Sequence, residues 1–425
     1  MAAARTSGWR VLEATAEPGG LCRTYFIDPQ TPNLRMSGPD TPDSYRFEMG
    51  GGHWMFGVDQ ALRGMLEKYS SLCEYSRNAA VFFPETGLTV PYPIQNHLLA
   101  LPKTIARRAA GEMLAPRSTE GGTLDAWLQN SFGPTLCELF FTPFHELYTA
   151  GLFRHIAPQD AQKSPVDLPR FRGAFERRGS PVGYNARYLY PCHGLGTLMK
   201  RIAEDCDVRY NSRATALDVS ERIVRTEDGT VWPYESLLST LSLDRTLALA
   251  HLDTDSAPDP YTSVCVLNIG ACRGSRCPAQ HWIYVPRSRS GFYRIGFYSN
   301  VTSEFLPKRI RRGSKYVSLY VERAYRGGAR PSDDDLRSYA DMAMRELQDW
   351  QFIRSVDVID MTWIETAYTW HIPGSRWVEE GIALLAHNGI RQAGRYARWK
   401  FQGIADCFRE GLQVGAELRT NVPHE

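Results

Sequence analysis

The sequence predicts a mixed α/β fold assembled from separated segments of the chain. Residues 9–23 (WRVLEATAEPGGLCR) combine a short apolar strand, which ends at Glu13, with a Gly19-Gly20 turn. Residues 124–148 have mainly helical spacing, and residues 261–322 are rich in Val, Ile, Tyr and Phe with turn residues at short intervals. We therefore expect an incomplete dinucleotide-binding (Rossmann-like) domain that carries a helical bundle insert and an antiparallel sheet domain.

The first of these stretches predicts half of a cofactor site. In a dinucleotide-binding fold, an acid that ends the second strand binds a ribose hydroxyl about 20 residues after a G-x-G-x-x-G turn. Only eight residues precede Trp9, and the sequence contains no G-x-G-x-x-G. We therefore interpret Glu13, Gly19, Gly20 and Arg23 as a vestigial cofactor site.

The remaining elements follow in chain order. Helices are expected at residues 58–72, 96–113, 124–148, 198–206, 332–350 and 402–418. Thr123 is a good N-cap for the third of these helices, and Ser332 with Asp335 forms a capping box for the fifth. Strands are expected at residues 81–92, 208–210, 214–219 and 237–241, and a hairpin at residues 223–234 closes at Asp228-Gly229. Residues 165–182 are irregular and basic, as in a connection between domains.

Composition excludes several classes of protein. Hydrophobic residues make up 43% of the 425 residues and charged residues 23%, which is typical of a globular protein. A net charge of +2 predicts no bulk affinity for nucleic acid or for an anionic membrane. The nine cysteines are scattered, and Cys272 with Cys277 is weak evidence for zinc, so we expect buried free thiols. With no apolar run of membrane-spanning length, a cytoplasmic protein is expected, with a homodimer possible.

The chain should divide into three domains. Residues 1–78, 186–258 and 374–425 are assigned to the Rossmann-like domain of the cofactor type. Residues 97–165 are assigned to the helical domain. Residues 79–96, 166–185 and 259–373 are assigned to the antiparallel sheet domain that binds substrate.

Scattered motifs along nearly the whole chain resemble one family, the UDP-galactopyranose mutases, and its eukaryotic branch in particular. Residues 12–23 (LEATAEPGGLCR) are similar to the family's second strand and flavin-ribose turn, and residues 49–54 (MGGGHW) to its histidine loop. Residues 90–96 (VPYPIQN) and 183–191 (GYNARYLYP) are similar to a substrate segment and to the start of the second cofactor part. The most specific match is HWIYVPRSRSGFYRIGFYSN at residues 281–300, and GRYARWKF at residues 394–401 is similar to the C-terminal flavin and substrate segment.

The resemblance implies an isomerase and a set of site residues. Enzymes of this family interconvert the pyranose and furanose forms of a nucleotide-bound galactose, using reduced FAD whose N5 attacks the anomeric carbon. His53 would be catalytic, and Arg294 would bind the nucleotide-sugar diphosphate through its planar guanidinium. The other substrate-binding candidates are Tyr284, Trp282, Asn185, Tyr92, Gln95, Tyr368 and Arg395.

Other positions depart from the family pattern. Phe401 and Val301 replace tyrosines, and Thr149 replaces the tryptophan that stacks on uracil, so a GDP-hexose is plausible. The family's second diphosphate arginine has no clear position, and Arg170 and Arg172 are candidates. The missing glycine turn predicts that FAD, the family cofactor, is absent from this chain.

With these departures, the sequence also resembles the flavin-independent GDP-L-galactose mutases of nucleoside-antibiotic pathways. Without flavin, a divalent ion such as Mn²⁺ or Mg²⁺ would stabilise the departing diphosphate, with His53 and His371 as its candidate ligands. We therefore expect a nucleotide-sugar mutase that acts on a nucleotide-diphosphate hexose without flavin. Two alternatives stay open, an FAD-dependent oxidoreductase like the amine oxidases whose N-terminus is truncated, and a non-catalytic nucleotide-sugar-binding protein.

Overall fold

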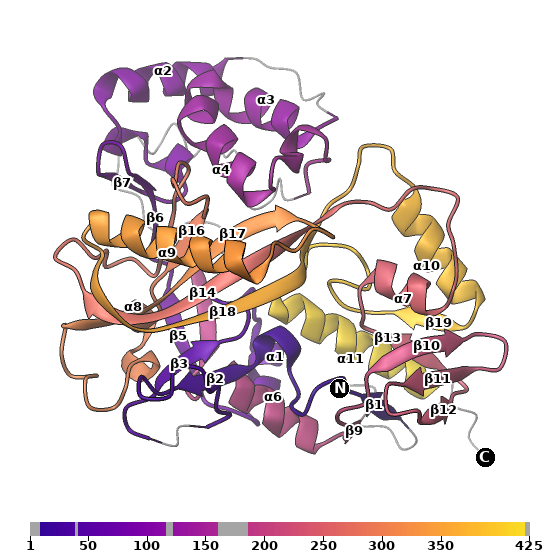
Figure 1. Cartoon of the computed structure of the whole chain (residues 1–425). Helices are drawn as coiled ribbons and strands as arrows, with labels where there is room; N and C mark the ends of the chain where they lie inside the picture. The colour runs from indigo at the N-terminus through magenta and orange to yellow at the C-terminus, as the bar shows by residue number, and fades with distance from the viewer. Residues whose placement is uncertain (1–8, 39–40, 116–121, 160–185, 421–425) are drawn as a thin grey trace.

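A computed structural model describes residues 9–38, 41–115, 122–159 and 186–420. Three groups of elements are visible in Figure 1: helices at the top, long strands across the middle, and smaller sheets and helices below and to one side. The expected mixed α/β fold is therefore confirmed. The segment at 165–182, which was expected to connect domains, lies outside the described residues, as do Arg170, Arg172 and Asn185.

A seven-stranded sheet forms the centre of the molecule. Its strand order is β18-β14-β17-β16-β15-β6-β7. The strands are β6 (Ala79–Phe83), β7 (Leu88–Pro91), β14 (Tyr261–Arg273), β15 (Trp282–Tyr284), β16 (Arg294–Gly296), β17 (Tyr316–Arg326) and β18 (Ile353–Thr369). Neighbouring strands are antiparallel, as expected, except that β15 pairs with β6 in parallel. The expected strand at 81–92 is in fact the β6–β7 hairpin, and the short helix α8 (Tyr298–Val301) follows β16.

One face of this sheet is covered by helix α9 (Asp333–Asp349), which lies across the long strands in Figure 1. The predicted cap is confirmed, because Asp335 N–H donates to Ser332 Oγ at 3.1 Å. Residues of one parity on β14 and β17, such as Leu267 and Leu319, pack with Leu336 and Leu347 of α9 in one apolar cluster. The opposite parity, which includes Tyr320 and Glu322, therefore faces the other side of the sheet.

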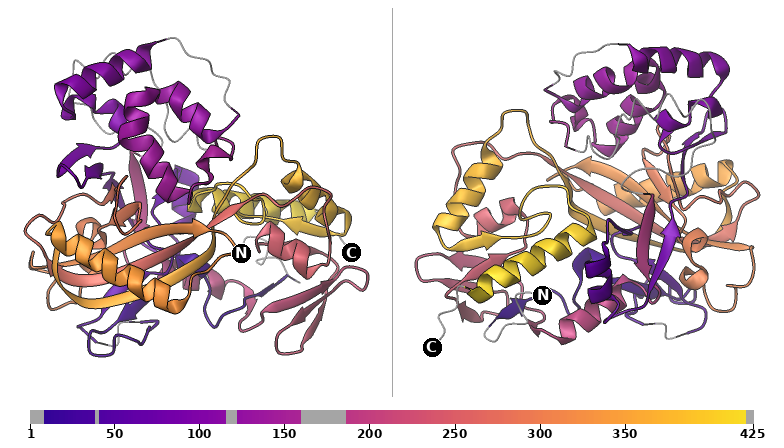
Figure 2. Two further views of the ribbon diagram at one scale, coloured as in Figure 1. Left: turned by 45° about the horizontal axis from the view of Figure 1, so that its top comes forward. Right: turned by 180° about the vertical axis from the view of Figure 1, so that it is seen from behind.

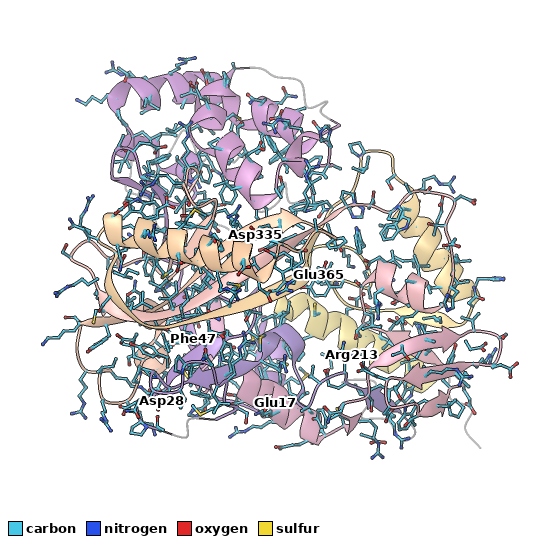
Figure 3. All side chains as sticks on the ribbon, viewed as in Figure 1. Glu17, Asp28, Phe47, Arg213, Asp335 and Glu365 are labelled. Atoms are coloured by element: carbon cyan, nitrogen blue, oxygen red, sulfur yellow. A yellow bond between two sulfur atoms is a disulfide. The ribbon has the colours of Figure 1, made fainter. Side chains whose placement is uncertain are left out.

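A second layer packs on that other side. It contains the β2–β3 hairpin, the three-stranded sheet β4-β8-β5 and three helices. Their bounds are β2 (Thr24–Ile27), β3 (Tyr45–Glu48), β4 (Met55–Phe56), α1 (Gln60–Leu66), β5 (Leu72–Ser76), β8 (Arg187–Pro191), α6 (Leu195–Glu204) and α11 (Ile404–Thr420). Figure 3 shows Phe47 of β3 below the long strands and Asp335 of α9 above them, so the sheet separates two cores.

The helical group is built from α2 (Lys103–Leu114), α3 (Leu124–Leu136) and α4 (Thr142–Tyr148). The expected N-cap at Thr123 is confirmed by an Ala126 N–H donated to its Oγ1. Residues 124–148 are mainly helical, as expected, but they do not form one continuous α-helix. Gly133 has φ of 83°, Pro134 has no N–H to donate, and a π-helical turn at Cys137–Phe141 precedes α4. This break sets the direction of α4, which carries Tyr148 at its end.

The remaining elements lie beside the second layer and are seen from behind in the right-hand view of Figure 2. Two pairs of strands are parallel, β1 (Arg10–Leu12) with β9 (Asp207–Arg209), and β13 (Leu237–Ser239) with β19 (Ile390–Gln392). The expected hairpin is confirmed as β11 (Ile223–Thr226) with β12 (Val231–Pro233), and β10 (Ala214–Asp218) extends it. Helices α7 (Leu243–Leu249) and α10 (Trp377–His387) pack on these strands.

The expectation that the cysteines are free thiols is wrong for one pair. Cys73 on β5 and Cys192, directly after β8, form a disulfide whose Cα atoms are 5.8 Å apart. Residues 119 apart in the chain meet there because β5 and β8 are antiparallel neighbours. Across the described ranges, no helix is both long and apolar enough for a membrane span.

Glu48, at the end of β3, is a fully buried acid in the second layer. Its carboxylate accepts hydrogen bonds from the Tyr190 hydroxyl, from Thr24 Oγ1 at 3.0 Å and from Leu195 N–H at 3.4 Å. Burial raises the pKa of Glu48 to about 7, although these partners oppose the shift. The network connects β2, β3, β8 and α6 directly below the glycine run that follows Glu48.

We expect Glu48 to make the free energy of unfolding depend on pH. Its pKa is raised in the folded state, so its contribution to stability is complete below pH 4.5 and is lost as the pH rises to about 7. The loss should be about 3 kcal/mol, at about 1.4 kcal/mol per pKa unit. Urea unfolding of Glu48→Gln between pH 4.5 and 7 should show a flatter dependence than the parent protein. The exposed Glu235→Gln variant is the control, and equal slopes for all three proteins would contradict the assignment.

Candidate active site

Two rows of side chains cross the central sheet on the face opposite α9. Strand register places each residue of β15 beside a residue of β16, which is beside a residue of β17. The first row is Tyr284, Arg294 and Glu322, and the second row is Trp282, Gly296 and Tyr320. Six residues from three strands therefore form one surface, which we call the sheet floor.

Arg294 and Glu322 form a two-point ion pair in the middle of the sheet floor. Arg294 Nη2 lies 2.5 Å from Glu322 Oε1, and Arg294 Nε donates to Glu322 Oε2 at 2.9 Å. The Tyr293 hydroxyl also donates to Glu322 Oε2, at 2.6 Å. Burial opposes the charged guanidinium and is the largest single effect, but Glu322 and the surrounding tyrosines together outweigh it, and the pKa of Arg294 is raised. The charge of Arg294, which sequence reasoning assigned to a diphosphate, is thus balanced within the protein.

The glycine run Gly50–Gly52 lies against the sheet floor and brings His53 to it. A Cβ on Gly52 would lie 2.0 Å from the Tyr320 hydroxyl oxygen, and a Cβ on Gly50 would lie 2.2 Å from His53 Cε1. Only glycine permits these two approaches. Burial, followed by the nearby charge of Arg395, lowers the pKa of His53 to about 4. His53 is therefore a neutral imidazole at neutral pH.

Aromatic rings from other elements surround the sheet floor. Tyr92, which follows β7, lies with its ring centroid 4.7 Å from that of Tyr284. Tyr148 of α4 lies 4.8 Å from Tyr368 of β18 and 5.2 Å from Tyr293. The helical group, the hairpin β6–β7 and the sheet therefore meet at this site. Gln95, in the turn that follows Tyr92, is 2% exposed, and both polar atoms of its side-chain amide lack a hydrogen-bond partner.

Arg395, in the loop after β19, lies among the same rings. Its guanidinium carbon is 4.5 Å from the ring centroid of Phe401 and 5.0 Å from that of Tyr368. It donates to two main-chain carbonyl oxygens, those of Ala367 at 2.9 Å and Gln402 at 3.3 Å. Tyr368 and Arg395 thus lie together. The charges of Arg294 and Arg395 both lower the pKa of His53, so the two arginines lie near this histidine.

Sequence reasoning missed three members of the sheet floor, Gly296, Tyr320 and Glu322. Tyr320 and Glu322 occur in YVSLYVER, where residues with polar groups alternate with apolar residues. That alternation was the available signal, because a charged residue inside a buried strand requires a partner. The partner could not be named, since strand register is not contained in the local pattern.

The residues predicted for a cofactor ribose also lie together, at the end of β1. Glu13 Oε1 accepts hydrogen bonds from Thr15 N–H at 2.8 Å and from Thr15 Oγ1 at 2.7 Å. Gly19 has a left-handed φ of 110°, and a Cβ there would lie 3.0 Å from Met199. Arg23 Nε donates to Gly20 O at 3.2 Å. A carboxylate at the end of a parallel strand, beside a tight glycine turn, fits the ribose end of a dinucleotide such as FAD.

These features define an α/β protein with the architecture of the FAD-dependent amine oxidase superfamily. A family model described as flavin containing amine oxidoreductase matches residues 9–418. The chain therefore belongs to that family.

Solved structures with the same fold carry different activities in their names. Reduced UDP-galactopyranose mutase matches with a TM-score of 0.82 and 21% identity, over 100% of this chain and 94% of that one. Cyclohexylamine oxidase from Brevibacterium oxydans IH-35A matches with a TM-score of 0.58 and 12% identity, over 97% and 94%. A CLA-producing fatty acid isomerase from P. acnes matches with a TM-score of 0.57 and 12% identity, over 97% and 92%. Identities this low show a shared fold, which does not by itself select the reaction.

The expected cofactor is wrong. The family match and the mutase neighbour point to FAD, whereas we expected a flavin-free protein with a divalent ion at His53 and His371. Among the described residues, no group of three His, Cys, Asp or Glu side chains could hold a metal ion. His371 Nδ1 instead lies 3.2 Å from Asp259 Oδ2. The positive charges that lower the pKa of His53 also oppose a cation beside it. The named relatives support the UDP-galactopyranose mutase type of fold and not the GDP-L-galactose branch.

We expect the Arg294–Glu322 pair to dominate the stability of the sheet floor. Arg294→Met leaves a buried carboxylate without its cation and should lower the free energy of unfolding by about 3–5 kcal/mol. The double variant Arg294→Met/Glu322→Gln should regain most of this loss, because no net charge remains buried. Urea unfolding measures both effects.

The exposed pair Arg289–Asp349 provides the matched control. Its side chains are 69% and 60% exposed, so solvent screens the pair and Arg289→Met should change the free energy of unfolding far less than Arg294→Met does. If Arg294→Met costs no more than Arg289→Met, the pair does not organise the site.

Proposed function

We propose that this chain is a nucleotide-sugar mutase, an isomerase that interconverts the pyranose and furanose rings of a nucleotide-diphosphate hexose. The observation that carries the proposal is the sheet floor, in which Tyr284, Arg294 and Glu322 lie in one row beneath the loop of His53. Two guanidiniums and several aromatic rings surround a neutral imidazole there. The match of the whole chain to reduced UDP-galactopyranose mutase supports the same activity.

The chain's own residues have separate parts in this proposal. Guanidinium groups bind diphosphate oxygens well, so Arg294 and Arg395 bind the diphosphate. Tyr284, Trp282, Tyr92 and Tyr368 supply flat surfaces that exclude water from the sugar. The amide of Gln95 has unused hydrogen-bonding groups for a sugar hydroxyl.

His53 has a hydrogen-bonding role in this proposal. Since it is neutral, it can donate a hydrogen bond from one ring nitrogen and accept one at the other. It would orient a ligand without adding a third positive charge to the site. We also propose that Asn185, which lies outside the described residues, contacts the substrate.

The cofactor-type residues have a place in the same proposal. Glu13, Gly19, Gly20 and Arg23 would hold the ribose end of FAD, and the His53 loop would lie near its ring. Bound FAD would supply a nucleophile for the anomeric carbon of the sugar. We further propose the three-domain division given by the sequence, with the parallel pairs β1–β9 and β13–β19 inside the Rossmann-like domain.

The proposal predicts ring contraction by the purified protein in the presence of reduced FAD. The protein would be supplied with FAD, reduced with dithionite, and incubated separately with UDP-galactopyranose and GDP-L-galactose. We expect the furanose form of one of these sugars, detected by anion-exchange chromatography and by the anomeric proton signal in NMR. Comparison of the two substrates also decides between the uridine and guanosine nucleotides.

Two control measurements separate this activity from the other reactions of the family. Oxidised FAD should give little or no product, and heat-denatured protein should give none. Release of hydrogen peroxide from amines under air, with no furanose from either sugar under reducing conditions, would show an amine oxidase and contradict the proposal. Tight binding of a nucleotide sugar without any conversion would instead show a non-catalytic binding protein.

A further inference from the structure

Glu346, on helix α9, is a buried acid on the face of the central sheet opposite the candidate active site. It is 2% exposed. Its carboxylate accepts three hydrogen bonds from the turn between β15 and β16. The donors are Ser288 Oγ at 2.9 Å, Arg289 N–H at 2.8 Å and Ser290 N–H at 2.8 Å. One side chain of α9 therefore holds this turn at three points.

The contact is costly for the fold, because Glu346 has no cation of its own. Within the described ranges its carboxylate forms no ion pair, and the neighbouring Arg289 pairs instead with Asp349 at 2.6 Å. A local hydrogen bond already closes the turn, since Gly291 N–H donates to Ser288 O at 3.2 Å. Burying a charge costs free energy unless the charge is paired and hydrogen-bonded. What Glu346 adds is a fixed position of the turn relative to α9 and the sheet.

Hydrogen bonds connect this turn to the ion pair of the sheet floor. Directly after the turn, Tyr293 O accepts from Val285 N–H at 2.9 Å, and Tyr293 N–H donates to Glu322 O at 2.9 Å. The Tyr293 hydroxyl donates to the carboxylate of Glu322, which holds Arg294. Glu346 and Arg294 thus lie on opposite faces of the sheet and are connected through the turn and Tyr293.

The same turn also contacts the helical group. Arg287 Nη2 donates to Glu138 O at 2.8 Å, in the π-helical turn that precedes α4. Helix α4 carries Tyr148, whose ring packs on that of Tyr293 beside the sheet floor. One turn therefore contacts two parts of the candidate site, the strand of Arg294 and the helical group above it.

We propose that Glu346 is a positioning residue of the active site, which fixes the β15–β16 turn and through it the position of Arg294. The inference rests on the proposed function, in which Arg294 binds the diphosphate of a nucleotide sugar. Glu346 contacts no ligand at the sheet floor, because it lies on the other face of the sheet. Loss of its hydrogen bonds lets the turn shift and weakens ligand binding, although every group that contacts the ligand is still present.

Glu346→Gln tests this role, because it keeps the size of the side chain but replaces one acceptor oxygen with a donor NH₂ group. Calorimetric titration of the full chain with UDP and with GDP measures binding. Affinity for the nucleoside diphosphate that the parent protein prefers should fall by about 2- to 30-fold, the range for residues that act on a site through a contact network. In turnover of the FAD-loaded protein, KM should rise by a similar factor while kcat is nearly unchanged, since Arg294 binds substrate and transition state alike.

Hydrogen exchange measured by mass spectrometry separates positioning from a local structural role. In Glu346→Gln, faster exchange should extend beyond the turn at 286–291 to the amide of Tyr293 and to the strand segments 294–296 and 320–322. A purely local role would confine faster exchange to the turn. Should Glu346→Gln fail to fold, Ser288→Ala removes one of the three donors and should cause the same changes to a smaller extent.

Asp349→Asn is the matched control. It removes the same charge from the same helix and breaks the other ion contact to the turn, but its side chain is 60% exposed. Affinity and exchange at residues 293–296 should be unchanged in this variant, and circular dichroism verifies folding. The proposal is overturned if folded Glu346→Gln binds as tightly as the parent protein, if its faster exchange stops at the turn, or if Asp349→Asn has equal effects.

These outcomes are distinguishable from failure of the proposed function. If the parent protein binds neither nucleoside diphosphate and converts no sugar, the proposed function fails and hydrogen exchange alone decides the role of Glu346. Faster exchange that reaches Tyr293 and Glu322 then supports the role, and faster exchange confined to the turn overturns it. If a sugar is converted and Glu346→Gln has the affinity and KM of the parent protein, the activity stands and the positioning role falls.

Discussion

The arrangement of the site depends on one buried ion pair, Arg294 with Glu322. Strand register places these residues side by side on β16 and β17, and a carboxylate in the middle of a sheet requires a cation. Two contacts hold the guanidinium against Glu322, while the Tyr293 hydroxyl donates to the same carboxylate. The rings of Tyr284 and Tyr320 flank it, and the second layer packs around this neutral centre.

Charge is distributed unequally across the site as a result. Glu322 neutralises Arg294, whereas Arg395 is held by rings and carbonyl oxygens. The imidazole of His53 is neutral because it is buried near both arginines. The field inside the site is therefore positive, which suits a diphosphate and disfavours a metal ion. The chain belongs to a flavin-containing family, and the positive charge of the site is consistent with flavin rather than a metal ion as the cofactor.

Local sequence patterns predicted those parts of the fold that depend on local chemistry. The cap at Ser332, the hairpin closed by Asp228-Gly229 and the apolar periodicity of α9 each depend on residues close in the chain. Two features were missed, a local break in one helix and a contact between distant segments. Helical spacing continues through residues 124–148, but Gly133 and Pro134 break the helix. The pairing of Cys73 with Cys192 depends on β5 lying beside β8.

In the candidate site, too, contacts between distant segments were missed. The family resemblance pointed to Tyr284, Arg294 and Arg395 as site residues, but it could not reveal that Glu322 forms an ion pair with Arg294. The missing glycine turn was interpreted as loss of flavin and led to the wrong cofactor. The match over residues 9–418 outweighs one absent motif, because many separated segments must agree to produce it.

The most direct measurement is a crystal structure of the reduced, FAD-loaded protein with a nucleotide-diphosphate hexose. The account predicts the sugar between the His53 loop and the row of Tyr284, Arg294 and Glu322, with the diphosphate reaching Arg395. A nucleotide sugar bound away from this row, or a site that accepts only an amine, would contradict it.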